Sequence, residues 1–99
     1  MAFLFLTIHH PKPEHRDEVL LSMERVGEVM RGAPGLLQIG PWKEQEGNRL
    51  FGIAIWESRE AFDRALEQFS SAARAGASGH DWNEGPTEEI FAEQAAWPT

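Results

Sequence analysis

Two adjacent histidines, His9 and His10, follow an apolar segment that begins at Phe3. An unperturbed imidazole titrates near neutral pH, so a histidine can act as general base toward an acidic phenol or enol. Side chains alternate between the two faces of a strand, so His9 shares a face with Thr7, and His10 shares the other with Ile8. Only one of the two histidines can face a cavity under the helices. The alternative is that both lie half-exposed at the strand end.

Aromatic and polar side chains elsewhere offer contacts for a planar ligand. Trp56 ends an apolar segment and can either stack on such a ligand or pack beneath the following helix. The loop His80-Asp81-Trp82-Asn83 combines an imidazole, a carboxylate and an indole, and binding residues are often found in loops. We take His80 and Trp82 as substrate contacts. The alternative is an ordinary surface loop in which Asp81 and Asn83 make turn hydrogen bonds.

The spacing of these groups favours neither a metal nor a covalent mechanism. His9, His80 and Asp81 could gather around a metal ion, but no helical histidine pair or close ligand spacing supports such a site. The chain has no cysteine, which excludes disulfides, thiolate metal sites and a cysteine nucleophile. Phosphate-loop glycine spacing and a serine hydrolase elbow are also missing. We expect no metal and no cofactor.

Length and charge narrow the class of protein. A chain of 99 residues is expected to form one domain, residues 1–99. The net charge of −7 arises from 16 acidic and 9 scattered basic residues, which argues against a nucleic-acid partner. Residues 1–8 are apolar but lack a basic leader, and no segment reaches membrane-spanning length. The absence of cysteine favours a reducing compartment, so we expect a cytoplasmic protein without membrane contact.

The first half of the chain predicts a strand, a helix and a second strand. Residues 3–10 are largely apolar and end before two prolines, of which Pro13 suits the first turn of a helix. The apolar stripe of that helix ends near Arg31, where Gly32 and Pro34 supply a stop. Residues 35–43 predict the second strand, and the polar connection 44–48 predicts a hairpin to the third.

The second half predicts a buried strand, a helix and a weaker final strand. Nearly every residue from 50 to 56 is apolar or small, so we expect both faces of this strand to be covered. Ser58 is a suitable N-cap, and the helix should begin near Arg59 with an apolar face packed on the sheet. After a loop rich in turn-forming residues, 87–95 predict the last strand.

This order of elements predicts an α+β fold. Strand, helix, strand, strand, helix, strand is the split βαβ pattern of the ferredoxin-like fold, with an antiparallel sheet and both helices on one face. The other face would expose several large apolar side chains, which association normally hides. We therefore expect a homodimer that packs through the helix-free sheet face.

Three stretches resemble the antibiotic biosynthesis monooxygenase domains of the dimeric α/β-barrel superfamily. They are the apolar first strand with its Pro- and Glu-started helix, APGLL at 33–37, and IAIWESREAF at 53–62. The resemblance implies a dimeric α/β barrel with a cavity between sheet and helices in each protomer. It also implies cofactor-free oxygenation of aromatic compounds, in which a deprotonated substrate reduces dioxygen directly. Because relatives have a cavity residue where Thr7 stands, we place Thr7 and His9 in the cavity, with His9 as base and Trp56 as a wall.

Other activities of the superfamily fit the residues less well. Haem degradation needs an Asn on strand one, and a Trp and a His on helix two, where this chain has Thr7, Arg64 and Arg74. The second helix contains no histidine, although many members of the family that this chain resembles carry one there. The leading hypothesis is a cofactor-independent monooxygenase acting on a small planar aromatic or quinol-like substrate. The alternatives are a non-catalytic dimeric binding module and a non-oxidative isomerase or lyase of the same superfamily.

Overall fold

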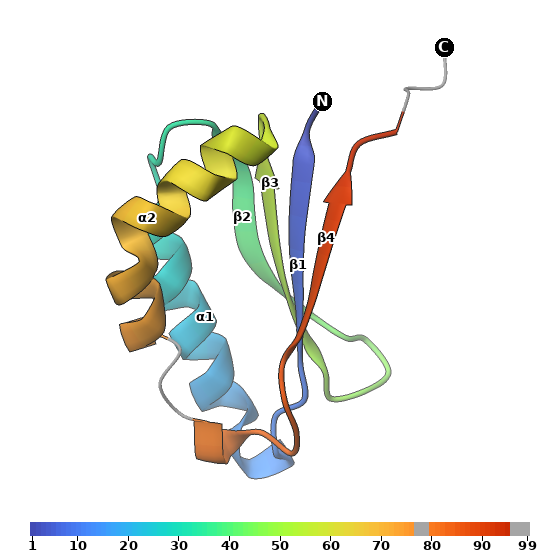
Figure 1. Cartoon of the computed structure of the whole chain (residues 1–99). Helices are drawn as coiled ribbons and strands as arrows, with labels where there is room; N and C mark the ends of the chain where they lie inside the picture. Colours follow the sequence, from blue (N-terminus) through green and yellow to red (C-terminus); the bar gives the residue numbers. More distant parts are fainter. Residues whose placement is uncertain (77–79, 96–99) are drawn as a thin grey trace.

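Four strands form one sheet, and two helices cover one of its faces (Figure 1). The computed structural model describes residues 1–76 and 80–95, with side chains for 1–69 and 81–95. In chain order the elements are β1 (Phe3–His9), a 3-10 turn (Pro13–His15), α1 (Arg16–Met30), β2 (Leu36–Lys43), β3 (Leu50–Trp56), α2 (Arg59–Gly76), a second 3-10 turn (His80–Trp82) and β4 (Glu88–Glu93). No helix in the described part of the chain is both long and apolar enough to cross a membrane.

The sheet has the order β2-β3-β1-β4, and every neighbouring pair is antiparallel. This order, with α1 and α2 on the same side, is the ferredoxin-like arrangement of a split βαβ fold, so the predicted fold class is confirmed. Strand β1 lies in the middle, where Thr7 pairs with Gly52 of β3 on one side and with Glu89 of β4 on the other. The central strand therefore brings residues from three parts of the chain together.

Several predicted boundaries were wrong by one to three residues. Strand β1 ends at His9 rather than at residue 10, because the carbonyl of His10 accepts a hydrogen bond from the backbone N–H of Glu84 in a loop. Pro13 does begin a helical turn, but this turn is a 3-10 turn closed by the N–H of His15 on the carbonyl of Lys12. Strand β4 spans Glu88–Glu93 rather than 87–95, and β2 begins at residue 36 rather than 35.

The start of α2 is fixed by a cap and by a close approach of the chain. Ser58 Oγ accepts a hydrogen bond of 3.2 Å from the N–H of Ala61, as expected of an N-cap residue. Beside it, the carbonyl of Gly35 accepts from the N–H of Glu57 at 2.8 Å. Gly35 has a φ of +85°, and a Cβ there would lie 2.5 Å from Ala61 Cβ, so only glycine fits.

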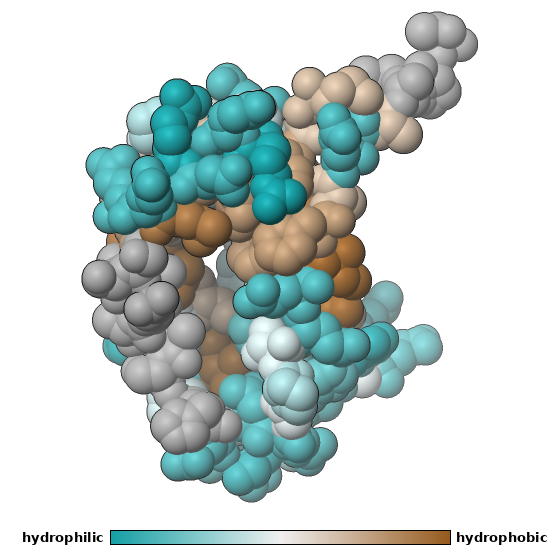
Figure 2. All heavy atoms as spheres, in the orientation of Figure 1, coloured by the Kyte–Doolittle hydropathy of each residue, from teal (hydrophilic) through white to brown (hydrophobic). Residues whose placement is uncertain are grey.

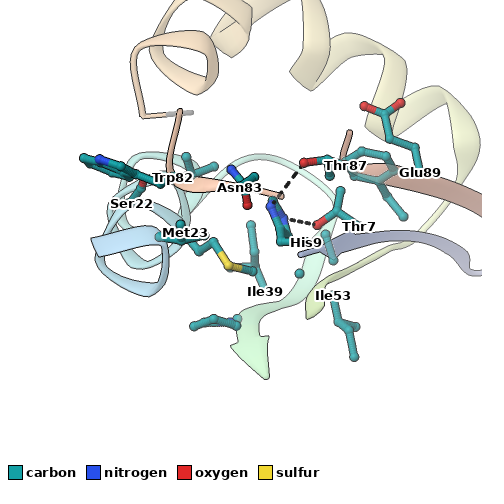
Figure 3. Close-up of a pocket in the computed structure, with 18 of the residues that line it drawn as sticks. Thr7, His9, Ser22, Met23, Ile39, Ile53, Trp82, Asn83, Thr87 and Glu89 are labelled. Carbon is teal, nitrogen blue, oxygen red and sulfur yellow. Dashed lines mark hydrogen bonds between the residues drawn. The ribbon is translucent and has the colours of Figure 1, made fainter. Parts of the chain in front are cut away.

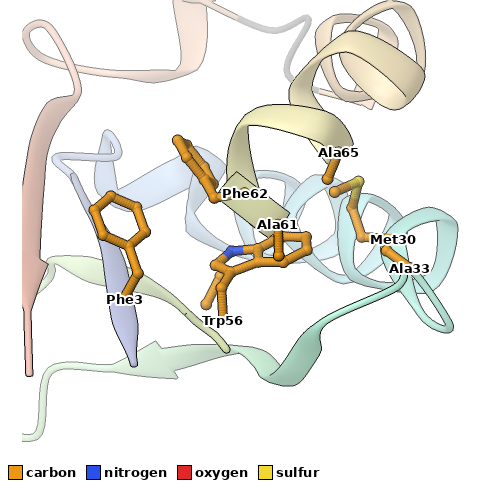
Figure 4. Packing of buried hydrophobic residues seen from close by; sticks show 8 residues of the cluster. Phe3, Met30, Ala33, Trp56, Ala61, Phe62 and Ala65 are labelled. Carbon is orange, nitrogen blue, oxygen red and sulfur yellow. The ribbon is translucent and has the colours of Figure 1, made fainter. Parts of the chain in front are cut away.

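The core lies where α2 crosses the end of β3 (Figure 4). Trp56 is 1% exposed, and its ring meets that of Phe62 edge-on at a centroid distance of 6.0 Å. Replacing a buried tryptophan with alanine typically costs about 3–5 kcal/mol, so Trp56 stabilises the junction of strand and helix. The buried cluster consists of Phe3, Met30, Ala33, Ala54, Trp56, Ala61, Phe62 and Ala65.

The face of the sheet turned away from the helices carries apolar side chains. Directly opposed residues of antiparallel strands share a face, and Leu6 is paired with both Ile53 and Ile90. On the same face Phe51 is paired with Trp42. Ile90 is 44% exposed and Trp42 is 52% exposed. We call the surface formed by these five residues the open sheet face, and neither α1 nor α2 covers it.

Candidate functional site

A cavity of about 430 Å³ lies between the sheet and the helices. Pockets for small organic ligands typically measure about 300–1,000 Å³. Figure 2 shows hydrophobic surface inside the opening between the helical layer and β4. Most of the lining is apolar and comes from Phe5, Val19, Met23, Val26, Ile39, Ala54 and Leu66. The polar side chains are fewer and are Thr7, His9, Ser22, Asn83, Thr87 and Glu89.

His9 projects into this cavity from the end of β1, on the side that strand alternation predicts (Figure 3). Its Nε2 lies 2.9 Å from Thr7 Oγ1, and its Nδ1 lies 3.4 Å from Thr87 Oγ1. In a neutral imidazole one nitrogen donates and the other accepts, so one threonine hydroxyl accepts from the ring and the other donates to it. The first contact is the shorter and therefore the stronger of the two.

Gly52 leaves the space that the Thr7 side chain occupies. Thr7 and Gly52 are directly opposed in β1 and β3, and a Cβ at position 52 would collide with Thr7 Oγ1. Any larger residue would push aside the hydroxyl that contacts the His9 ring. The orientation of His9 thus depends on a glycine of the neighbouring strand.

The surroundings of His9 favour its neutral form. Desolvation in the apolar cavity lowers its pKa from the ordinary value of 6.5, and the nearby charge of His10 lowers this pKa further. His10 points to the other side of the strand, where its Nε2 lies 2.7 Å from Glu88 Oε2. At neutral pH His9 is therefore uncharged, with a lone pair on one ring nitrogen available to accept a proton.

The loop before β4 is anchored to the end of β1. The N–H of Lys12 donates to the carbonyl of Trp82 at 2.7 Å, and the N–H of Glu84 donates to the carbonyl of His10 at 2.7 Å. Between these bonds, Asn83 forms an isolated antiparallel bridge with Pro11. This anchoring places the Trp82 and Asn83 side chains in the cavity lining, close to the strand end that bears His9.

The predicted site residues fall into three groups. Thr7, His9 and Trp82 line the cavity, and the Trp82 ring stacks on His15 at a centroid distance of 6.1 Å. Trp56 does not line it, so its placement as a cavity wall was wrong: its ring is enclosed beneath α2, the packing alternative considered for it. The side chain of His80 lies outside the described residues.

Asn83, Thr87 and Glu89 were not predicted as site residues, although all three line the cavity. Asn83 was considered only as a turn residue. Thr87 and Glu89 enter the cavity because β4 pairs with β1, in a register that joins Glu89 to Thr7. Alternation along a final strand next to β1 is the signal that could have suggested both residues, once a register had been assumed.

Among residues whose side chains are described, no group of three His, Asp or Glu side chains is close enough to hold a metal ion. The His9 contacts are to hydroxyl groups instead. The cavity's described chemistry is thus one imidazole, hydroxyls, an amide and a carboxylate in a mainly apolar enclosure.

Comparison with protein families gives a match over most of the chain. The model of the antibiotic biosynthesis monooxygenase family matches residues 1–76. The chain belongs to this family. The match runs from β1 to the end of α2 and stops before the loop and strand that bring Asn83, Thr87 and Glu89 to the cavity. A search of curated proteins gave no significant match.

Solved structures share the fold of this family member at low sequence identity. Rv0793 from Mycobacterium tuberculosis is 14% identical, with a TM-score of 0.82 over 100% of both chains. The ActVA-Orf6 monooxygenase of Streptomyces coelicolor, solved with the ligand nanaomycin D, is 22% identical, with a TM-score of 0.73 over 99% of this chain and 93% of that one. SnoaB, a cofactor-independent oxygenase from Streptomyces nogalater, is 19% identical, with a TM-score of 0.73 over 97% and 95%.

Proposed function

We propose that this protein is a cofactor-independent monooxygenase that oxidises a small planar aromatic or quinol-like substrate in the cavity. The observation that carries the proposal is His9, an imidazole with a lowered pKa held between two threonine hydroxyls in an apolar enclosure. Membership of the monooxygenase family supports the reaction class. The cofactor-independent oxygenase SnoaB and the nanaomycin D complex of ActVA-Orf6, both of the same fold, support the ligand class.

His9 would act through its Nδ1. We assign the ring proton to Nε2, where it is donated to Thr7 Oγ1, and the lone pair to Nδ1, because the 3.4 Å contact with the Thr87 hydroxyl is longer and more easily replaced by a substrate. A substrate that displaces this hydroxyl can transfer an acidic proton to Nδ1. Proton transfer by a positioned base of this kind contributes about 10²–10⁴-fold to a rate.

The anion so formed is the reductant in the proposed reaction. For an anthrone-type ring, a CH₂ group becomes a carbonyl, one atom of dioxygen enters the product, and the other leaves as water. The ring carbon supplies the four electrons that dioxygen accepts, so no external reductant is required. The apolar lining contributed by Phe5, Val26 and Ile39 would keep bulk water away from the anion.

Oxygen uptake with an anthrone substrate tests this function. Removal of the base in His9→Ala should lower the enzyme-dependent rate about 100-fold, while circular dichroism shows an unchanged fold. His10→Ala, the neighbouring residue on the opposite face, is the matched control and should change the rate less than about threefold, through its small effect on the pKa of His9. Equal rates for His9→Ala and wild type would remove His9 from the mechanism.

The rival function is a non-catalytic binding module. One observation favours it: α2, Arg59–Gly76, contains no histidine, so His9 has no second imidazole from this helix to share a proton. In that case the cavity would bind the aromatic compound without any oxygen consumption above the uncatalysed rate.

We also propose that the protein is a homodimer joined through the open sheet face. Exposed apolar patches of this kind usually mark an interface. Leu6, Ile53 and Ile90 lie side by side on three adjacent strands, so a second copy of the face would bury them together. The cavity lies on the opposite side of the sheet, so each protomer would keep its own site.

A further inference from the structure

The described residues that line the cavity include one carboxylate and neither lysine nor arginine. The carboxylate belongs to Glu89, an exposed residue that both water and a ligand in the cavity can reach. The other ionisable side chain of this lining is His9, which is neutral near pH 7. Glu89 rises from β4 on the side of the sheet that carries Thr7 and His9 (Figure 3). A ligand in the cavity therefore meets a negative charge that no described lining residue balances.

The Glu89 carboxylate makes no ion pair or hydrogen bond with any other described residue. Its neighbour Glu88, by contrast, contacts His10 at 2.7 Å on the opposite face. An aromatic ring that enters the cavity displaces water from the Glu89 carboxylate. A carboxylate that loses water without gaining a partner costs free energy, and a cationic group on the ring offsets this cost.

The register of β1 and β4 sets the separation between Glu89 and His9. Thr7 is opposite Glu89, and His9 follows two residues later along β1, so His9 and Glu89 are diagonal neighbours on one face of the sheet. The Cα atoms of such neighbours in antiparallel strands are about 7–8 Å apart. This separation is comparable with the length of a naphthalene ring that carries a substituent at each end. One ligand can therefore contact His9 with one end and Glu89 with the other.

We propose that the Glu89 carboxylate binds a cationic substituent of the aromatic ligand, such as a protonated amine, so that the cavity prefers cationic rings to neutral rings of the same shape. The inference rests on the proposed function for the aromatic ligand class. The net charge of −7 acts in the same direction, because an acidic protein attracts cations. Glu89 is then a specificity determinant that takes no part in proton transfer.

The test compares 2-naphthylmethylamine, a cation at about pH 7, with the neutral 2-naphthylmethanol by calorimetry at low ionic strength, where screening is weak. Wild type should bind the amine about fivefold more tightly, a modest factor because water partly solvates the Glu89 carboxylate. Glu89→Gln keeps the shape of the side chain but removes its charge. It should bring the two affinities to within about twofold by weakening the binding of the amine alone. Glu89→Lys should reverse the preference.

Glu93→Gln is the matched control. Glu93 lies on the same strand and the same face as Glu89, but it does not line the cavity. Both variants lose one negative charge, so a preference set by net charge alone would fall equally in both, whereas the inference expects Glu93→Gln to retain it.

Three results would overturn the inference and leave the proposed oxygenase function standing. They are equal affinities for the two ligands in wild type, a preference that survives in Glu89→Gln, and an equal loss of preference in Glu93→Gln. If neither ligand bound at all, the inference and the aromatic ligand class would both be wrong. Oxygen uptake with an anthrone, which carries no cationic group, tests the catalytic proposal separately.

Discussion

The chemistry of the site depends on how one imidazole is held. His9 contacts a hydroxyl through each ring nitrogen, and the contact with Thr7 at 2.9 Å is shorter than the contact with Thr87 at 3.4 Å. Burial keeps the ring neutral. In the proposed reaction, a base that is neutral at pH 7 and already oriented would need little reorganisation to accept a substrate proton.

The lowered pKa of His9 makes stability depend on pH in a defined direction. In the unfolded chain the imidazole takes up a proton near pH 6.5, whereas in the folded protein it does so only at lower pH. The unfolded state therefore binds more protons below pH 6.5, and the folded state loses stability as the pH falls. We expect the drop in Tm between about pH 7.5 and about pH 5.5 to be smaller in His9→Gln than in wild type.

His10→Gln serves as the comparison for that measurement. This variant leaves the desolvation of His9 intact and removes only the charge of His10, which is the smaller of the two causes that lower the pKa of His9. The drop in Tm of His10→Gln should therefore stay close to that of wild type. An identical drop in wild type and His9→Gln would mean that the pKa of His9 is not lowered by folding.

At the scale of elements, the amino-acid pattern predicted strands and helices well because their periodicities differ. It located the α2 N-cap at Ser58, and it placed Thr7 and His9 on one face by alternation alone. It left two roles open for Trp56, because burial beneath α2 depends on how the helix crosses the strand. It could not predict Asn83, whose position depends on hydrogen bonds between segments about 70 residues apart.

The register between β1 and β3 places Gly52 opposite Thr7, and a substitution at Gly52 tests this pairing. Gly52→Ala should force the Thr7 hydroxyl away from the His9 ring, and displacement of a positioned catalytic group by about 1 Å can cost about 100-fold in rate. The loss should appear in oxygen uptake with an anthrone. It should not appear with Gly40→Ala, since a Cβ at position 40 on the adjacent strand has no neighbour within 4 Å. Equal rates for the two variants would show that Thr7 does not position His9.

At the scale of the whole molecule, the sheet separates two surfaces with different roles. One face carries the helices and the cavity, and the other is the open sheet face, where Ile90 is 44% exposed. A chain of 99 residues has a limited core, so burial of this second face would add substantially to its stability.

A charge on the open sheet face should dissociate the proposed dimer. Light scattering on wild type should give about twice the chain mass of 11.2 kDa, and Ile90→Glu should give a single chain, because an unpaired carboxylate in an apolar interface is strongly unfavourable. Leu21→Glu on α1 is the control, since Leu21 is similarly exposed at 46% but lies on a helix. A wild-type mass of one chain would refute the dimer, and an Ile90→Glu mass of two chains would place its interface elsewhere.

The buried core and the polar end of the cavity draw on different parts of the chain. Every core residue in the described chain lies between Phe3 and Ala65, whereas Asn83, Thr87 and Glu89 come from the last quarter, beyond the family match. Under the proposed function, substitutions at these three positions would alter which compounds the cavity recognises without disturbing the packing of the core. In that case a few mutations in one short segment would be enough to change the substrate. The same division marks residues 82–89 as the segment to randomise when engineering new specificities.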